Sequence, residues 1–478
     1  MNDRMSRFFL PSALVACCLA GVLMVVFRPG YLTNADNLGM LIFLELVLAV
    51  IWNYRQRFFP FLILVFIFSG TGVPPMGFWH SGRWFVLGVG ALAGLFNYVR
   101  DHRHHFGMFH LTASFCVLAA IFSSLVSSYP NQALLKALSL LLLFLYAACG
   151  IRLAVAGREE SFFPVLLLGC ELLVYITAIC YFIAHFEFFG NPNSLGADMG
   201  VLVVPVMLWE VVVTERPLTQ KRRILALSLS LLLLLSSYAR AGILAAAVSC
   251  ILLCVALRRY RTLLLVMGSA LLMALVVATM APAPSESPQS LASSFVYKGH
   301  QESGVLGSRK TVWQQALASV REHRWFGTGF GTSATGADAT EQSSRFVSGP
   351  QATREHGSSY LAILEWVGAV GAVPFFALVF MVAINVGRSL AWMRRSGNPS
   401  SLVVPIAAVM AAGLVHAAFE DWLFAVGYYL CVFFWTLAFV LVDLLPAAHL
   451  SVQDNHVDAP FSPLRWSRSF GAAHLPTR

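Results

Sequence analysis

Apolar runs close to the length of a bilayer crossing recur along the whole sequence, and they constrain the fold more than any other feature. A transmembrane helix needs about 20 consecutive apolar residues, and these runs are too long and alternate too little for the strands of a membrane β-barrel. Only 12% of the 478 residues are charged, against about 25% in an ordinary soluble domain. The sequence therefore predicts an all-α, polytopic membrane protein with about 12–14 transmembrane helices.

The predicted helix count is a range because two of the apolar runs, 59–71 and 224–239, are short for full crossings. With every run counted as a span, both termini lie on the same side of the membrane. The expected helices are 8–27, 37–54, 59–71, 83–99, 107–126, 133–151, 162–185, 195–213, 224–239, 241–257, 262–280, 359–386, 401–419 and 423–443.

The distribution of charge predicts the orientation. The formal net charge is +9, but the basic residues form short clusters between apolar runs, so we expect no nucleic-acid partner. Cytoplasmic loops of membrane proteins carry clusters of this kind. When the N-terminus is placed in the cytoplasm, most Lys and Arg residues fall inside, including Arg258, Arg259, Arg394 and Arg395. The long polar segment 281–357 then faces the periplasm.

Four regions follow from this topology. Residues 1–280 are expected to form the N-terminal transmembrane helices, and 281–357 one large periplasmic loop. Residues 358–445 are expected to form the C-terminal transmembrane helices, and 446–478 a disordered cytoplasmic tail.

The large loop contains a predicted amphipathic helix over 308–323. Val312, Ala316 and Val320 recur at helical spacing on one stripe, and the glycine-rich segment 327–331 ends the pattern. Such a helix can lie on the membrane surface and cover a cavity.

The cysteines argue against a cross-linked or metal-bound loop. All nine lie in apolar segments and none lies in 281–357, so neither a disulfide framework nor a structural zinc site is expected. No acidic metal-binding cluster is evident either. We therefore expect no cofactor and no metal ion.

Three residues are the candidates for chemistry. Arg240 lies between two short apolar runs, where a guanidinium is costly unless it is paired, although it can also reach water at the membrane interface. Arg309 begins the amphipathic helix and can equally be a solvated loop residue. His356 lies just before a helix, whose N-terminal partial positive charge disfavours imidazolium, so a neutral imidazole there can accept a proton.

Further polar residues mark two predicted outer mouths of the helix bundle. Glu420 and Asp421 end the expected helix 401–419, and Asn191 and Asn193 lie in a turn before 195–213. Either group can line a cavity, and either can simply be interfacial polar residues.

Four stretches together resemble the O-antigen ligase and O-antigen polymerase family of bacterial membrane glycosyltransferases. They are Phe189-Gly-Asn-Pro-Asn-Ser-Leu-Gly, Ser237-Tyr-Ala-Arg240-Ala-Gly, Gly307-Ser-Arg309-Lys-Thr-Val-Trp313 continuing to Trp325-Phe-Gly-Thr-Gly-Phe-Gly331, and His356-Gly-Ser-Ser-Tyr360-Leu361 running on to Glu365-Trp-Val-Gly368.

The resemblance implies a sugar transfer on the periplasmic face of the bacterial inner membrane. The donor would be a glycan on undecaprenyl pyrophosphate, and the acceptor a hydroxyl on lipid A core, on another glycan or on a protein. Membrane lipids would surround the chain. The family's two arginines and loop-end histidine correspond here to Arg240, Arg309 and His356. The family usually reads His-Asn-Ser-Tyr-Leu, one residue shorter than the stretch beginning at His356, so Glu355 and Arg354 remain alternative bases.

Two other classes of function remain open from the sequence. A transporter or flippase of lipid-linked glycans would place ionisable groups near the membrane midplane, and Glu45 and Glu171 are the clearest acids within predicted helices. A non-catalytic scaffold of a polysaccharide export complex is the third possibility.

Overall fold

The computed structural model describes residue 47 and residues 57–71, 78–100, 106–155, 159–186, 188–214, 217–280, 307–333, 355–396 and 399–453. Within these ranges the secondary structure is helical and no strand occurs. The expected helix 8–27, all of 37–54 except Val47, and residues 454–478 of the expected tail lie outside this part of the chain.

The helix boundaries agree with the hydropathy pattern to within a few residues in most places. The largest differences are in α16 and α18, which extend to Ser396 and Gln453, well beyond their expected ends at 386 and 443. The elements are α3 (Phe58–Gly70), α4 (Phe78–Arg100), α5 (Met108–Leu125), α6 (Pro130–Leu145), η2 (Tyr146–Gly150), α7 (Arg152–Val155), α8 (Glu159–Ala178), η3 (Ile179–Ile183), α9 (Pro192–Ala197), η4 (Asp198–Val203), α10 (Val204–Val213), α11 (Pro217–Ser236), α12 (Arg240–Ala256), α13 (Tyr260–Met280), α15 (Gly307–Glu322), α16 (Ser359–Ser396), α17 (Val403–His416) and α18 (Tyr429–Gln453).

The predicted fold class, an all-α polytopic membrane protein, is confirmed. Six helical stretches in the described part of the chain are long and apolar enough to cross a membrane, and further apolar helices of 10–17 residues accompany them. The six are Met108–Leu125, Pro130–Val155, Phe162–Ile183, Pro192–Val213, Tyr260–Val277 and Ser359–Ser396.

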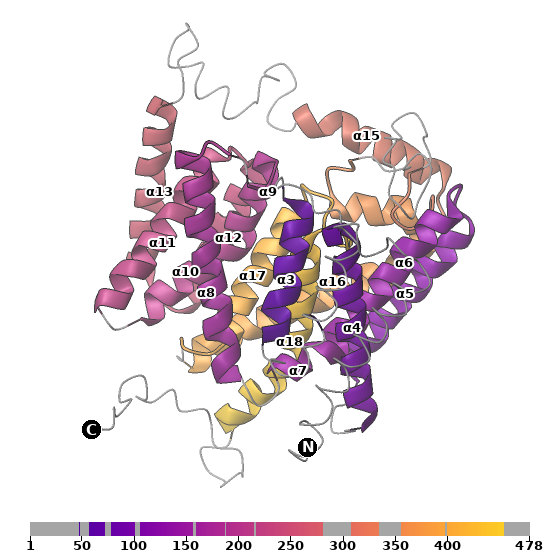
Figure 1. The fold of residues 1–478 in the computed structure, drawn as a ribbon, viewed down its shortest axis with the longest axis horizontal. Coiled ribbons are helices and arrows are strands. Elements are labelled where there is room, and N and C mark those ends of the chain that lie inside the picture. The colour runs from indigo at the N-terminus through magenta and orange to yellow at the C-terminus, as the bar shows by residue number, and fades with distance from the viewer. Residues whose placement is uncertain are drawn as a thin grey trace, which may run out of the picture.

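The helices form a bundle around α17 and α18. Nearly every residue from Val403 to Gly413 is buried, as is most of α18 up to Leu441. This fits their sequences, since a helix that is apolar all round belongs in a core or in lipid. The helix α13 lies at the periphery in Figure 1, and only 6% of its apolar window is buried inside the protein. A membrane is the natural environment for such a helix.

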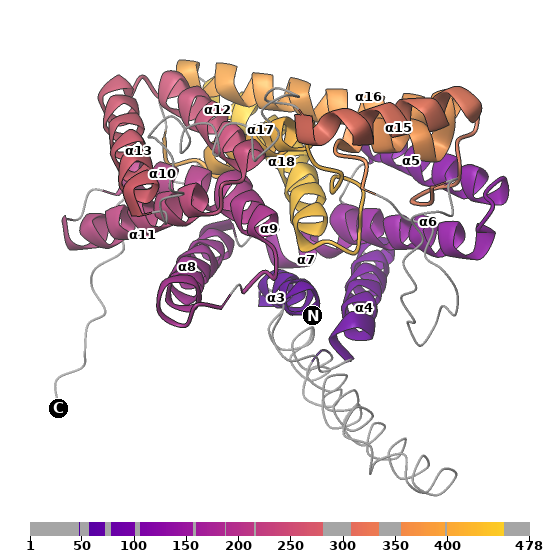
Figure 2. The same cartoon turned by 90° about the horizontal axis from the view of Figure 1, so that it is seen from above.

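The helix α15 differs from the others in direction. In Figure 1 it lies across the upper end of the molecule, whereas α8 and α13 stand upright. Figure 2 shows it alongside α16, with which it is in contact. The predicted amphipathic helix therefore exists and caps one end of the bundle.

Close helix packing explains why α4 has glycine at both Gly90 and Gly94. A Cβ on Gly94 would lie 2.3 Å from the backbone nitrogen of Gly150, and one on Gly90 would lie 2.4 Å from the Phe58 ring. We predict that Gly94→Val destabilises the protein by about 1–3 kcal/mol, the usual range for overpacking. Its apparent Tm in detergent should fall, whereas Gly88→Val should leave the Tm nearly unchanged because nothing lies within 4 Å of a Cβ at Gly88. Equal Tm values for the two variants would contradict this.

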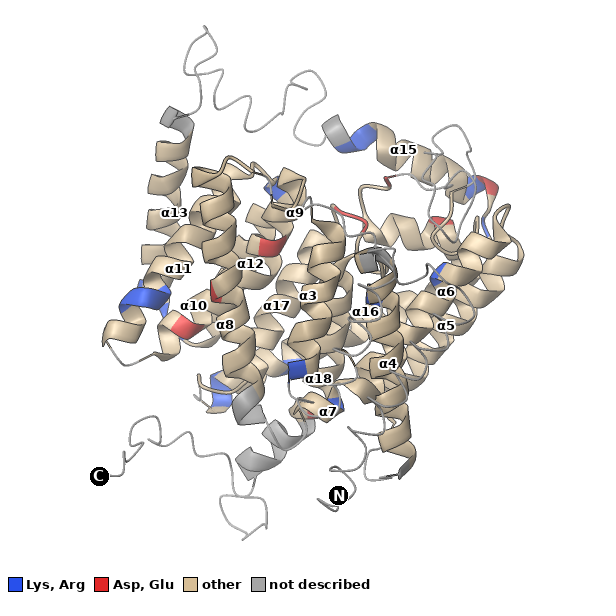
Figure 3. Cartoon of the chain, viewed as in Figure 1, with Lys and Arg blue, Asp and Glu red and all other residues tan. Residues whose placement is uncertain are grey.

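Charged residues are sparse along the helices (Figure 3). Arg223 from α11 contacts Glu171 of α8 at 2.6 Å and Glu210 of α10 at 3.3 Å. Arg223, which lies just before the expected helix 224–239, has a side chain only 9% exposed. Glu171 is therefore one member of a buried ion-pair network, in which removing one partner leaves an uncompensated charge.

Candidate active site

The helix α15 brings Arg309 to the site. Ala316 is fully buried and Val312 and Val320 are partly buried, as the predicted stripe requires, while Leu317 on the flank is 43% exposed. The indole nitrogen of Trp313 donates a hydrogen bond to the carbonyl of Gly357, 3.0 Å away. This bond attaches the helix to the far end of the loop and places Arg309 beside it.

The Arg309 guanidinium contacts two carboxylates from different segments. Its Nη1 donates to Glu355 Oε1 at 2.5 Å, and its Nη2 donates to Glu420 Oε1. The Arg309 and Glu420 side chains are 15% and 19% exposed, while Glu355 is 61% exposed. Burial raises the pKa of Glu420 to about 7 against the opposing attraction of Arg309. A carboxyl group that titrates near neutrality is suited to proton transfer.

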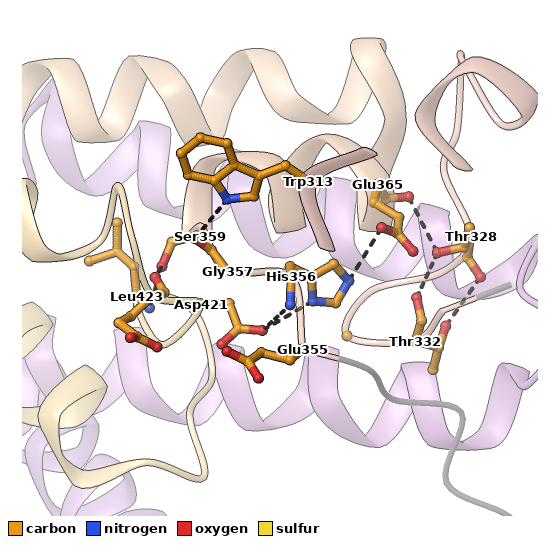
Figure 4. A network of polar contacts seen from close by, with 12 residues as sticks. Trp313, Thr328, Thr332, Glu355, His356, Gly357, Ser359, Glu365, Asp421 and Leu423 are labelled. Carbon is orange, nitrogen blue, oxygen red and sulfur yellow. Dashed lines mark hydrogen bonds and ion pairs between the residues drawn. The ribbon is translucent and has the colours of Figure 1, made fainter. Parts of the chain in front are cut away.

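His356 lies next to this cluster and is almost fully buried (Figure 4). Its backbone nitrogen and its Nδ1 both contact Asp421 Oδ2, at 2.9 and 3.1 Å. On the other side of the ring, Nε2 lies 3.4 Å from Glu365 Oε2. The edge of the imidazole meets the Trp366 ring at a centroid distance of 5.3 Å. Each ring nitrogen therefore faces a carboxylate.

The charge preference predicted for His356 is wrong. Burial alone lowers its pKa, but the hydrogen bonds and charges of Asp421 and Glu365 outweigh burial, and the net pKa is raised above 6.5. The same contact lowers the pKa of Asp421, although burial opposes this. A helix N-terminus acts by about 0.3–1 kcal/mol, which two adjacent carboxylates exceed. The surroundings of His356 therefore favour the imidazolium form more than water does, instead of disfavouring it.

Ser359 joins the start of α16 to the loop that carries Glu420 and Asp421. Its Oγ donates to the Glu420 carbonyl at 2.6 Å and accepts from the Leu423 backbone N–H at 3.0 Å. Its own N–H bonds the carbonyls of Ala417 and Glu420. These bonds fix the relative positions of His356 and Asp421, which are 65 residues apart.

The remaining predicted residues lie on a neighbouring pair of helices. Asn191 caps α9, its Oδ1 accepting from the Asn193 N–H at 2.8 Å. Arg240 is the first residue of α12. The two helix starts pack closely, since a Cβ on Gly196 would lie 2.1 Å from the Cβ of Ala239. Asn191 thus has a structural role at a helix start next to that of Arg240.

Tyr428 lies between the two groups. Its phenol hydrogen-bonds the Ser194 side chain of α9, and its pKa is raised mainly by burial, with smaller contributions from the charges of Asp198 and Glu420. Its hydroxyl is also 3.2 Å from that of Tyr429. The structure therefore brings Arg309 into contact with Glu355 and Glu420, and His356 into contact with Asp421. Asn191, Asn193 and Arg240 lie instead at the starts of α9 and α12. Arg354 lies outside the described residues.

Glu365 is the functional candidate that the sequence interpretation missed. It is fully buried in α16. From the sequence alone it is only one residue of the stretch 356–368 that resembles the family. Its signal was available: an acid within an apolar membrane helix is rare and needs a partner.

In the part of the chain that the structure describes, no three or more His, Cys, Asp or Glu side chains are arranged so that they could hold a metal ion. The cluster instead holds one arginine, one histidine and four carboxylates, contributed by α15, the loop end, α16 and the loop after α17.

Comparison with known proteins gives one result for this region. Residues 225–376 match the family model described as O-antigen ligase, while no curated protein matches the chain. The matched stretch contains Arg240, Arg309, His356 and Glu365 and ends before Glu420. Residues 225–376, about a third of the chain, are therefore similar to the O-antigen ligase family.

Proposed function

We propose that this protein transfers a glycan from undecaprenyl pyrophosphate to an acceptor hydroxyl, as a ligase or polymerase of surface polysaccharide. The observation that carries the proposal is the occurrence of the Arg309–Glu420 and His356–Asp421 contacts on adjacent residues of the same loop, at one end of a membrane-spanning bundle. The family match over the same stretch supports a membrane glycosyltransferase of this type.

The basic end of the bundle supports a periplasmic site in the bacterial inner membrane. The helix α12 begins at Arg240 and leads to Arg258 and Arg259, and α16 begins at the site and ends with Arg394 and Arg395. The site and these clusters therefore lie at opposite ends of the same helices. Clustered arginines mark the cytoplasmic side.

Arginine is suited to the leaving group of this reaction. Displacement at the anomeric carbon releases a pyrophosphate on which negative charge develops. A guanidinium offers two parallel N–H groups to phosphate oxygens, and fixed cations at developing charge lower the barrier. Arg309 is the group in place at the cluster, and Arg240 is the second cation proposed. With these two, the reaction proceeds without a metal ion.

His356 and Glu420 are the groups able to take the proton of the acceptor hydroxyl. Asp421 holds Nδ1 of His356, which orients the ring as the third residue of a catalytic triad does. Glu420, with its pKa of about 7, is the alternative. Glu355 is the least suitable, because it is largely exposed and paired with Arg309.

The acceptor is a hydroxyl on lipid A core, on another lipid-linked glycan or on a protein. The polyprenyl chain of the donor would lie among the apolar helices. The transporter alternative loses part of its basis, since Glu171 is paired with Arg223, and Glu45 lies outside the described residues.

Transfer by purified protein tests the proposal. The protein receives an undecaprenyl-pyrophosphate oligosaccharide and lipid A core, with EDTA present, and Arg240→Ala serves as the inactive control. One glycan block moved to the acceptor indicates a ligase, and longer lipid-linked chains without acceptor indicate a polymerase. Absence of product with lipid A core, lipid-linked glycan and protein acceptors alike, from a protein that binds the donor, would contradict the proposal.

Glu355 competes with phosphate for the Nη1 of Arg309, and this gives a prediction. Glu355→Gln should lower the KM for the donor several-fold, because the neutral amide binds the guanidinium more weakly. Glu322→Gln removes the same charge from an exposed position at the end of α15 and should leave the KM nearly unchanged. A higher KM for Glu355→Gln would show that Glu355 contacts the substrate favourably.

A further inference from the structure

The helix α16 is interrupted just beyond the site. Gly368 has φ 66° and ψ −176°, a non-helical conformation inside the helix. In a continuous α-helix, the N–H groups of Ala369 and Val370 would bond the carbonyls of Glu365 and Trp366. Here those N–H groups bond the carbonyls of Arg324 and Trp325, at 2.8 and 3.3 Å. The interruption thus frees the two carbonyls of α16.

The glycine-rich segment after α15 takes up the freed carbonyls. The Thr328 N–H donates to the Glu365 carbonyl at 2.9 Å, and the Gly329 N–H to the Trp366 carbonyl at 3.0 Å. Four backbone hydrogen bonds therefore link 324–329 with 365–370, a connection called the backbone joint below. Ser123 of α5 adds a bond from its Oγ to the Trp366 carbonyl at 2.5 Å.

Only glycine fits at the two closest points of the backbone joint. A Cβ on Gly368 would lie 2.4 Å from the carbonyl carbon and oxygen of Trp325, and one on Gly327 would lie 2.4 Å from those of Trp366. Both glycines also have positive φ, which other residues adopt at a cost. The stretches 325–331 and 356–368, which contain these two glycines, are therefore linked into one structural feature by the backbone joint.

The backbone joint holds Glu365, whose fully buried carboxylate faces His356. We propose that Glu365 is a positioning residue for His356, with the backbone joint fixing its carboxylate opposite Nε2 so that the ring is held from both sides. This inference rests on the proposed role of His356 in glycan transfer. It also gives the glycine segment a role at the site.

The groups around His356 come from four segments: α15, the loop end that carries Glu355, α16 and the loop after α17. Asp421, in the loop after α17, faces Nδ1, and Glu365 of α16 faces Nε2. Arg309 of α15, with Glu355 and Glu420, forms the adjacent cluster. Because a nearby negative charge favours imidazolium, neutralising Glu365 should move the titration of His356 to lower pH. A role in packing alone would not move it.

Hydrogen exchange at histidine C2, followed by mass spectrometry on the full-length protein in detergent, measures this titration residue by residue. Glu365→Gln should lower the midpoint of His356 by about one pH unit or more. Gly368→Ala should lower it as well, because the added Cβ forces the backbone joint apart. Gly387→Ala, in the same helix with nothing within 4 Å of its Cβ, should leave it unchanged.

A parallel transfer assay separates the two levels of inference. If glycan transfer requires neutral His356, the acid limb of the rate profile in Glu365→Gln should move to lower pH together with the midpoint. An unchanged midpoint in both Glu365→Gln and Gly368→Ala would overturn the positioning role. A shifted midpoint in a protein whose wild type transfers no glycan would preserve the pairing of Glu365 with His356 and overturn the proposed function instead.

Discussion

Replacing Arg309 with alanine is expected to reduce glycan transfer by about 10²–10³-fold, the usual loss when one electrostatic contact to a developing negative charge is removed. The reason is that Arg309 is the arginine bound to the Glu355 and Glu420 carboxylates of the cluster. Its loss also leaves the partly buried Glu420 facing Glu355 and Asp421, which repels an incoming pyrophosphate. The measurement is kcat/KM for a lipid-linked oligosaccharide donor.

Lys310→Ala is the matched control for Arg309→Ala. It removes one positive charge from the next residue, which is exposed, and should retain near wild-type kcat/KM. Arg309→Lys should recover only part of the activity, since an ammonium lacks the two-pronged geometry of the guanidinium. Comparable losses in Arg309→Ala and Lys310→Ala would mean that general charge, not the contact geometry, governs donor binding.

Replacing His356 with glutamine is expected to lower kcat by about 10²–10⁴-fold, the typical contribution of a general base. The wild-type rate should rise with pH, because a base must be unprotonated and the two carboxylates raise the pKa of His356 above 6.5. The acid limb should therefore have its midpoint above 6.5 and should be absent from the residual activity of His356→Gln. Rates measured from pH 5.5 to 9 would establish both points.

His323→Gln provides the control for this experiment. His323 follows α15 and is partly buried, and it takes no part in the cluster contacts described above. Its replacement should leave the rate profile unchanged. If His356→Gln keeps its rate and its acid limb, Glu420 becomes the base, and Glu420→Gln should then remove the limb near pH 7.

The membrane fold was predictable because hydropathy is a local property. Runs of apolar residues form helices in lipid wherever they occur, since every backbone group must be hydrogen-bonded within the segment. The amphipathic α15 was found for the same reason, from the spacing of Val312, Ala316 and Val320. The interruption at Gly368 was not predicted, because it depends on backbone partners at Arg324 and Trp325 that lie more than 40 residues away in the sequence.

The site was only partly predictable. The resemblance selected Arg309 and His356, and Glu420 and Asp421 were noticed as polar residues at a helix end. Which carboxylate pairs with which cation could not be read from the chain, because Arg309 and Glu420 are 111 residues apart. Glu365 stands out in the sequence as an acid within an apolar helix, but only the structure shows that its carboxylate faces His356.

The sequence by itself determined that the chain is a helical membrane protein, where its helices lie and which residue types are available for sugar transfer. The tertiary structure alone decided which carboxylates pair with Arg309 and His356, and in which direction these pairs shift the pKa values. The proton affinity of His356 depends on Asp421 and Glu365, which folding brings to opposite sides of its ring, and the position of Glu365 depends on a backbone joint between two distant segments. Local sequence specifies a helix, but an electrostatic environment is set by whichever charges the fold brings within a few ångströms.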